Sequence, residues 1–338
     1  MRCMNQYLSV LVAFSFTLAT TAFAEEPCTI LEQYEVSNMQ PVRSQDGVSF
    51  CYAFASVALV QQLYCKNKKG GCVYSFDPKT KTSADDRLSV VDALALVSEG
   101  RLVEGGAETL TLHAIKNKGS LALEKCAPFD GLIQSDHKFA SLGVKSNWWQ
   151  RLRDLFKQYR SYDTLAMAAP AEQKFARACA IAEKVKETAN LKTDVDQIAT
   201  ALKRDEFQKF AKEAILPNQC EESRVPLPSF SVKTLGSADP ASAGPKIASL
   251  LKNDTPVNVS ICTAGPHPKC GGHAIVLSGI RHKCCGSSCS RQYRIHDSAN
   301  VFWSKADRDN YSEPWVDAGI VLKKVEQFGG DPVRWLEF

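Results

Sequence analysis

One cysteine of this 338-residue chain stands where reactive sulfur chemistry is expected. Cys51 lies near the start of residues 49–64, where apolar side chains recur at helical spacing and glycine and proline are absent. The first turn of a helix carries about half a positive charge and unpaired backbone N–H groups, and both stabilise a thiolate. A thiolate is the nucleophilic form of cysteine. A nearby imidazole would complete an ion pair and later protonate a leaving group.

The segment around this cysteine resembles the active-site segment of papain-like (C1) cysteine peptidases. Residues 45–54 read QDGVSFCYAF, a Gln and a Gly before the nucleophile, then an aromatic residue, Ala and Phe. Further segments follow in family order. EGG at 104–106 is similar to the glycines of the substrate cleft, GHAI at 272–275 to the histidine strand, and HDS at 296–298 stands where the family has Lys-Asn-Ser.

The resemblance implies a role for each matching residue. Cys51 is the expected nucleophile and His273 the general base and acid. Gln45 is expected to form the oxyanion hole with the backbone N–H of Cys51. Asp297 is expected to orient the His273 ring, although the family usually has Asn there. A carboxylate can perform this role and also stabilises the imidazolium, so the substitution predicts a shifted pH range.

The same resemblance assigns Gly105, Gly106 and Gly272 to substrate binding, with the Gly pair letting a peptide backbone approach as an added strand. Other readings of these residue types remain open. Cys51 could be a disulfide half, His273 a core residue, Gln45 a loop amide and Gly105-Gly106 a plain turn. Asp297 could be a turn residue, with Asn300 supplying the amide.

The elements that must position these residues divide the chain by type. Helical spacing continues over 85–97 and 105–117, where Gly119 is expected to end the helix. The later part favours strands at 256–261, which alternates as a half-buried strand does, and at 274–280 and 293–296. Helices first and strands last predict an α+β fold. The resemblance implies the papain-like two-lobe fold, with a helical left lobe and a β-rich right lobe.

Residues 131–226 differ in character, being rich in Lys, Glu, Ala and Gln. Apolar residues recur there at helical spacing, and Thr193 with Asp196 resembles a helix-start box. We expect an inserted, mainly helical block. The family's histidine follows its cysteine by ~130–150 residues, and removing this block brings the separation here close to that value. The predicted organisation is therefore a left lobe at 25–130, the block, and a right lobe at 227–338.

Composition and cysteine content indicate the compartment in which the protein is found and limit its possible partners. Residues 1–24 have a basic start, a short apolar stretch and an Ala-Phe-Ala cleavage site, which together predict a signal peptide. The 13 cysteines favour an oxidising compartment, secreted or periplasmic. Outside the signal and a catalytic thiol, 11 cysteines remain, so at most five disulfides and one unpaired cysteine are expected.

No segment is apolar enough for a membrane anchor, and a net charge of +4 gives no reason to expect nucleic acid. A zinc site is disfavoured because the spacing of the late cysteines and histidines does not match C-x2-C pairs, and no cofactor is expected. Its candidate ligands are Cys270, His273, His282, Cys284, Cys285 and Cys289. The predicted partners are a peptide or protein substrate, with a protein inhibitor or partner at 131–226.

The resemblance therefore predicts a secreted cysteine peptidase that hydrolyses peptide bonds. Two alternatives remain open. The same triad would serve an acyl or peptidyl transferase in which an amine accepts the acyl group. A binding protein that kept the fold without catalysis is the other.

Overall fold

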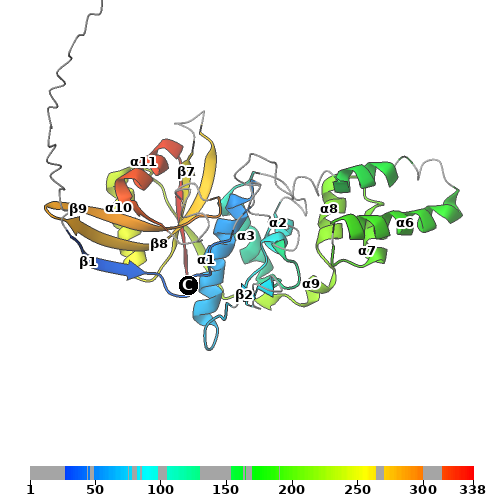
Figure 1. Cartoon of the computed structure of the whole chain (residues 1–338), viewed down its shortest axis with the longest axis horizontal. Helices are drawn as coiled ribbons and strands as arrows, with labels where there is room; N and C mark the ends of the chain where they lie inside the picture. Colours follow the sequence, from blue (N-terminus) through cyan, green and yellow to red (C-terminus); the bar gives the residue numbers. More distant parts are fainter. Residues whose placement is uncertain are drawn as a thin grey trace, which may run out of the picture.

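The computed structural model of the chain combines helices and strands (Figure 1). It describes residues 27–43, 45, 49–74, 76–77, 82–83, 86–97, 105–129, 154–162, 164, 170–189, 191–263, 270–299 and 314–338. The helices are α1 (Cys51–Asn67), α2 (Val90–Leu96), α3 (Glu108–Lys118), α6 (Ala171–Ala189), α7 (Val195–Ala201), α8 (Phe207–Ile215), α9 (Gln219–Glu222), α10 (Pro240–Lys252) and α11 (Ala318–Phe328). The strands are β1 (Cys28–Glu35), β2 (Phe76–Asp77), β3 (Thr82–Ser83), β4 (Ser120–Leu121), β5 (Val225–Pro226), β6 (Ser231–Leu235), β7 (Val257–Cys262), β8 (Gly272–Cys285), β9 (Ser288–His296), β10 (Trp315–Asp317) and β11 (Val333–Glu337).

A seven-stranded antiparallel sheet runs in the order β10-β9-β8-β7-β11-β6, with β1 paired to β8. β8 is its central strand: one edge pairs with β7 near its start and β1 near its end, and the other edge pairs with β9. Residues 25–130 are predicted to form the helical left lobe, but β1, which lies within this range, belongs to the sheet. All eight residues of β1 are exposed, so it lacks the alternation by which a half-buried strand is predicted.

Two apolar cores lie on the two faces of the sheet. One joins the sheet to α10 and α11, and the other joins α1–α3 to the described helices of the 131–226 block. Side chains of β8 alternate between them: Ile275 and Leu277 enter the first core, and Ala274 and Val276 the second. Because β8 is covered on both faces, its sequence is a continuous apolar run.

Strand β7 corrects one sequence expectation. Its alternation predicts a half-buried strand, but all six residues are buried. The polar face, Asn258 and Ser260, lies under the helical half of the molecule, where Ser260 donates a hydrogen bond to Glu108 of α3 at 3.0 Å. Alternation of apolar and polar residues shows two different faces, but burial of the polar face depends on partners elsewhere in the chain.

Helix α1 lies at the centre of the molecule, between the sheet on one side and α2 and α3 on the other (Figure 1). Nearly all of its residues are buried, as expected of a helix surrounded by protein. The predicted helix over 105–117 corresponds to α3, which ends where expected, at Gly119, in a left-handed conformation with φ 67°. The pattern over 85–97 forms only the shorter α2, whose start is capped by Ser89.

The 131–226 region is mainly helical where it is described, with α6–α8 and a helical stretch at 154–162 at the end of the molecule remote from β8 and β9, and α9 nearer its middle (Figure 1). The apolar repeats predicted from sequence fall on α7 and α8. The predicted helix-start box is wrong: Asp194 rather than Thr193 precedes α7, and neither side chain caps it. Residues 130–153 and 165–169 of this region lie outside the described residues.

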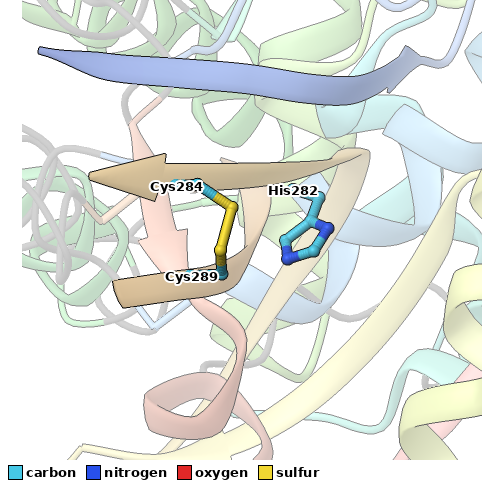
Figure 2. Close-up of side chains that lie close together, drawn as sticks. All are labelled: His282, Cys284 and Cys289. Atoms are coloured by element: carbon cyan, nitrogen blue, oxygen red, sulfur yellow. A yellow bond between two sulfur atoms is a disulfide. The ribbon is translucent and has the colours of Figure 1, made fainter. Parts of the chain in front are cut away.

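Among the described residues, five disulfides join ten cysteines, and Cys51 and Cys179 are free. The sequence predicts this result, because 11 cysteines beyond a catalytic thiol leave one without a partner. The bonds are Cys28–Cys285, Cys65–Cys72, Cys126–Cys220, Cys262–Cys270 and Cys284–Cys289. The last of these closes the tip of the β8–β9 hairpin (Figure 2). Disulfides in this number are typical of proteins that fold in an oxidising compartment.

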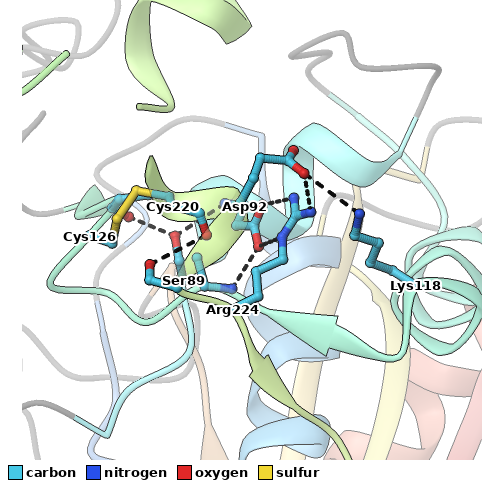
Figure 3. A network of polar contacts seen from close by, with 10 residues as sticks. Ser89, Asp92, Lys118, Cys126, Cys220 and Arg224 are labelled. Carbon is cyan, nitrogen blue, oxygen red and sulfur yellow. Dashed lines mark hydrogen bonds and ion pairs between the residues drawn. A yellow bond between two sulfur atoms is a disulfide. The ribbon is translucent and has the colours of Figure 1, made fainter. Parts of the chain in front are cut away.

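A disulfide and ion pairs connect the helical block to the region of α2 and α3 (Figure 3). The Cys126–Cys220 disulfide lies beside the buried ion pair of Arg224 and Asp92, whose Nη2 and Oδ1 are 2.6 Å apart. A second hydrogen bond, from Arg224 Nε to Asp92 Oδ2 at 2.9 Å, makes the contact bidentate. Such a fork fixes the orientation of the two elements as well as their distance.

Across the described part of the chain, no helix has the length and apolar character that crossing a bilayer requires. The predicted signal peptide, residues 1–24, lies outside the described residues.

Candidate active site

Cys51 is the first residue of α1; the residue is partly exposed and forms no disulfide. Phe50 precedes the helix with its ring fully buried against Phe129, so the apolar side chain anchors this turn. The N–H groups of Ala53 and Phe54 donate to the carbonyl of Phe50 at 2.9 and 3.1 Å, whereas the N–H of Cys51 lies ahead of the first carbonyl of the helix. The structure therefore rules out the disulfide alternative for Cys51 and places its thiol at the positive end of a 17-residue helix.

His273 lies near the start of β8, opposite Ile261 of β7. Its ring is buried and has two partners: Nε2 lies 2.7 Å from Oδ1 of Asp297, and the side chain of Cys51 is the second. An imidazole between a thiol and a carboxylate can hold a proton for one and be oriented by the other. This arrangement does not fit a plain core histidine.

Burial by itself would lower the pKa of His273, but hydrogen bonds to Asp297 and Cys51, and their charges, raise the pKa to about 9. The ordinary value is 6.5, so the ring is positively charged at neutral pH in this environment.

Asp297 follows the last residue of β9 and is fully buried. The β8–β9 register pairs His296 with Val276, so continuing it sets Asp297 opposite Ile275, two residues from His273. Oδ1 of Asp297 also accepts a hydrogen bond from the backbone N–H of Ala299 at 2.9 Å. The aspartate thus caps a turn and contacts the imidazole at once. Asn300, the alternative source of an amide, lies outside the described residues.

Gln45 is buried and tied to the turn after β9 by two hydrogen bonds. Its backbone N–H donates to the carbonyl of Ser298 at 2.9 Å, and its side-chain Oε1 accepts from Ser298 Oγ at 2.7 Å. Because Ser298 holds the oxygen end of the amide, the nitrogen end is the one that can donate. Ser298 has no role in the sequence analysis, although it stands directly after Asp297.

The three predicted substrate-binding glycines lie next to these side chains along the chain or in space. Gly105 has φ 72° and donates its N–H to the carbonyl of Ser49, two residues before Cys51. A Cβ on Gly106 would stand 2.7 Å from the ring of Tyr52, so only glycine fits there. Gly272 is exposed and precedes His273 on β8.

The late cysteines and histidines do not form a metal centre in the oxidised protein. The ligand atoms of His282, Cys284 and Cys289 lie within 4.8 Å of one another, but the two sulfur atoms are joined in a disulfide (Figure 2). Cys270 and Cys285 are likewise bound, to Cys262 and Cys28. Zinc is held by thiolates, which these bonded sulfurs do not provide.

No protein-family model and no curated protein sequence matches the chain. Solved structures similar to it include two bromelains. One is the bromelain protease from Ananas comosus in complex with the E64 inhibitor, with TM-score 0.44 and 11% identity over 89% of this chain and 94% of that chain. The other is a recombinant stem bromelain precursor, with TM-score 0.44 and 10% identity over 91% of this chain and 71% of that chain. Similarity at this level assigns neither family nor activity.

Proposed function

We propose that the chain is a papain-like cysteine peptidase that hydrolyses peptide bonds with Cys51, His273 and Asp297. One observation carries the proposal: a free thiol at the start of a long helix contacts a buried histidine whose far nitrogen is 2.7 Å from a buried aspartate. Each partner has one chemical use in acyl transfer, as nucleophile, proton carrier and orienting carboxylate.

In the first half-reaction, the Cys51 thiolate attacks the carbonyl carbon of the scissile peptide bond. The His273 imidazolium then gives its proton to the leaving nitrogen as the C–N bond breaks, and a thioester remains on Cys51. In the second half-reaction, neutral His273 takes a proton from water, whose oxygen attacks the thioester. Departure of the thiolate releases the carboxylic acid product and restores the ion pair.

The negative charge that develops on the carbonyl oxygen needs donors that are already in place. The first-turn N–H of Cys51 and the Nε2 amide of Gln45 are the proposed donors. Ser298 supports this assignment because it holds the opposite end of the Gln45 amide. Gly105, Gly106 and Gly272 flank the reacting sulfur and imidazole, and we assign them to the passage of the substrate backbone.

The proposed setting is outside the reducing cytosol. Export through residues 1–24 would deliver the chain to the oxidising compartment that its five disulfides favour. Within that compartment the helical region 131–226 is the proposed surface for a protein inhibitor or partner.

The test compares Cys51→Ala with Cys179→Ala, since these two cysteines are the free thiols of the described chain. Hydrolysis of a fluorogenic peptide library by the purified mature protein should fall more than about 10³-fold in Cys51→Ala, because the nucleophile is gone. Cys179→Ala should keep wild-type turnover. Iodoacetamide should inactivate wild type and Cys179→Ala at the same rate. Full peptide hydrolysis by Cys51→Ala would overturn the proposal.

The same assay distinguishes the transferase alternative. When an amine acceptor is added, a transferase forms the new amide in preference to the free acid, whereas a peptidase continues to release mainly acid. A protein in which iodoacetamide modifies Cys51 but no peptide or amide product ever appears would point to the non-catalytic binding protein.

A further inference from the structure

A small internal cavity adjoins the candidate active site. Its polar lining comes from Gln40, Arg43, His296 and Ser298, and its apolar wall from α1 and Ala274. All of its lining residues are buried. The space open to the centre of a water molecule is about 10 Å³, close to the minimum that a single water requires.

Two polar atoms that belong to lining residues of this cavity are fully buried without a hydrogen-bond partner in the described structure. They are Oε1 of Gln40 and Nε of Arg43. The first is an acceptor and the second a donor, so they need opposite partners. A buried donor or acceptor that is left without a partner destabilises the folded protein.

One water molecule has the chemistry to satisfy two such atoms, because it can accept a hydrogen bond from Arg43 Nε and donate one to Gln40 Oε1. An anion would satisfy the arginine but repel the carbonyl oxygen of Gln40. The charge of Arg43 is in addition already balanced by Glu124, with Nη1 and Oε2 2.7 Å apart in a buried ion pair. Size, polarity and charge therefore favour a neutral molecule with both donors and acceptors.

Building on the proposed function, we infer that the cavity holds one ordered water molecule, through which Gln40 and Arg43 position Ser298 and hence the oxyanion-hole amide of Gln45. Ser298 lines the cavity and donates its only hydroxyl hydrogen to Gln45 Oε1. The second hydrogen of the water is then available to the Ser298 oxygen. A chain of hydrogen bonds in one direction polarises each member and holds the amide in a single orientation.

The test uses Gln40→Met, which removes the acceptor at similar length, and Gln40→Glu, which keeps an acceptor. Tyr293→Phe is the control, because Tyr293 Oη is another buried polar atom without a partner in the described structure, but its ring lies in the core on the other side of the sheet. Crystal structures should show an ordered water in wild type, Gln40→Glu and Tyr293→Phe, and none in Gln40→Met.

Kinetics should separate positioning from folding. Loss of a whole oxyanion donor costs about 10²–10³ in turnover, so a mobile Gln45 amide should lower kcat by about 3- to 10-fold. KM and the rate of Cys51 alkylation by iodoacetamide should stay unchanged, because neither uses the oxyanion hole. Gln40→Glu should restore kcat, and Tyr293→Phe should not alter it.

A dry cavity in wild type, an ion in place of the water, or an unchanged kcat in Gln40→Met would overturn the inference. Failure of the proposed function would give a different result, because the wild-type protein would then hydrolyse no peptide. Crystallography would still show whether the cavity holds a water molecule. The proposed role of Gln40 and Arg43 in positioning Gln45 would be wrong together with the peptidase activity.

Discussion

Two junctions hold the molecule together, and they are built from different interactions. The first, which we call the sheet junction, joins α3 to strands β7 and β11 through buried polar side chains. Arg334 of β11 donates to Ser260 Oγ at 2.9 Å and to Thr109 Oγ1 at 2.7 Å, and its Nη1 lies 3.5 Å from Oε2 of Glu108. The candidate active site spans the same boundary, because Cys51 comes from α1 and His273 from the sheet.

The second, the helical-block junction, relies on one disulfide and one bidentate ion pair (Figure 3). None of these residues contacts the candidate site. Because the polar sheet junction includes the site and the helical-block junction does not, we expect loss of stability at the two junctions to have different consequences for activity.

The largest effect is expected from removing the covalent staple of the helical-block junction. The Cys126–Cys220 bond spans 94 residues, so replacing both by Ala should lower the free energy of unfolding by nearly 5 kcal/mol. Removing Cys65–Cys72, which spans seven residues, should cost about half as much. Urea unfolding measures both, while iodoacetamide inactivation of Cys51 should remain as in wild type where each variant is folded. Slower inactivation would mean that the two junctions are coupled.

Next, Arg334→Met should leave Glu108 buried without its cation and lower the free energy of unfolding by about 3–5 kcal/mol. The matched change at the other junction is Arg224→Met, which likewise leaves a buried carboxylate, that of Asp92, without its cation. Peptide hydrolysis at a temperature where both are folded should fall only in Arg334→Met, because only that arginine lies at the boundary that carries the site. Equal losses of activity would remove the distinction between the junctions.

A smaller effect is expected from Asp297→Asn. Without the carboxylate charge, the pKa of His273 should fall from about 9 toward 6.5, so the alkaline limit of kcat/KM should move down by one pH unit or more. The folded-state pKa exceeds the ordinary value, so the stability contributed by the protonated ring is complete below pH 6.5 and is lost as the pH rises through about 9. An alkaline limit that stays in place would show that Asp297 does not act on the ring electrostatically.

The smallest change is expected from Ser298→Ala, which removes the hydrogen bond from the Ser298 hydroxyl to Gln45 Oε1. A loss of about 1 kcal/mol in transition-state stabilisation corresponds to about a 5-fold lower kcat. The rate of Cys51 alkylation should not change, because the thiol and imidazole keep their contacts. A parallel fall in alkylation and kcat would instead indicate that the whole site has moved.

Local features of the fold follow from the amino-acid sequence alone. Helical spacing around Cys51, the glycine stop at Gly119 and the apolar run of β8 are set by neighbouring residues, and the structure has all three. The odd number of cysteines beyond a catalytic thiol likewise required one more unpaired cysteine. These features depend on backbone preferences and counting, which need no knowledge of distant contacts.

Which of these segments contact one another depends on the tertiary structure. β1 shows no alternation because neither face is buried, and it became part of the sheet through pairing with a strand more than 200 residues away. The polar face of β7 can be buried because Arg334 and Glu108 form hydrogen bonds with Ser260. Ser298 acquired a partner, Gln45, from the opposite end of the chain. Burial and hydrogen bonding are properties of surfaces brought together by folding, so a residue's own sequence neighbours do not specify them.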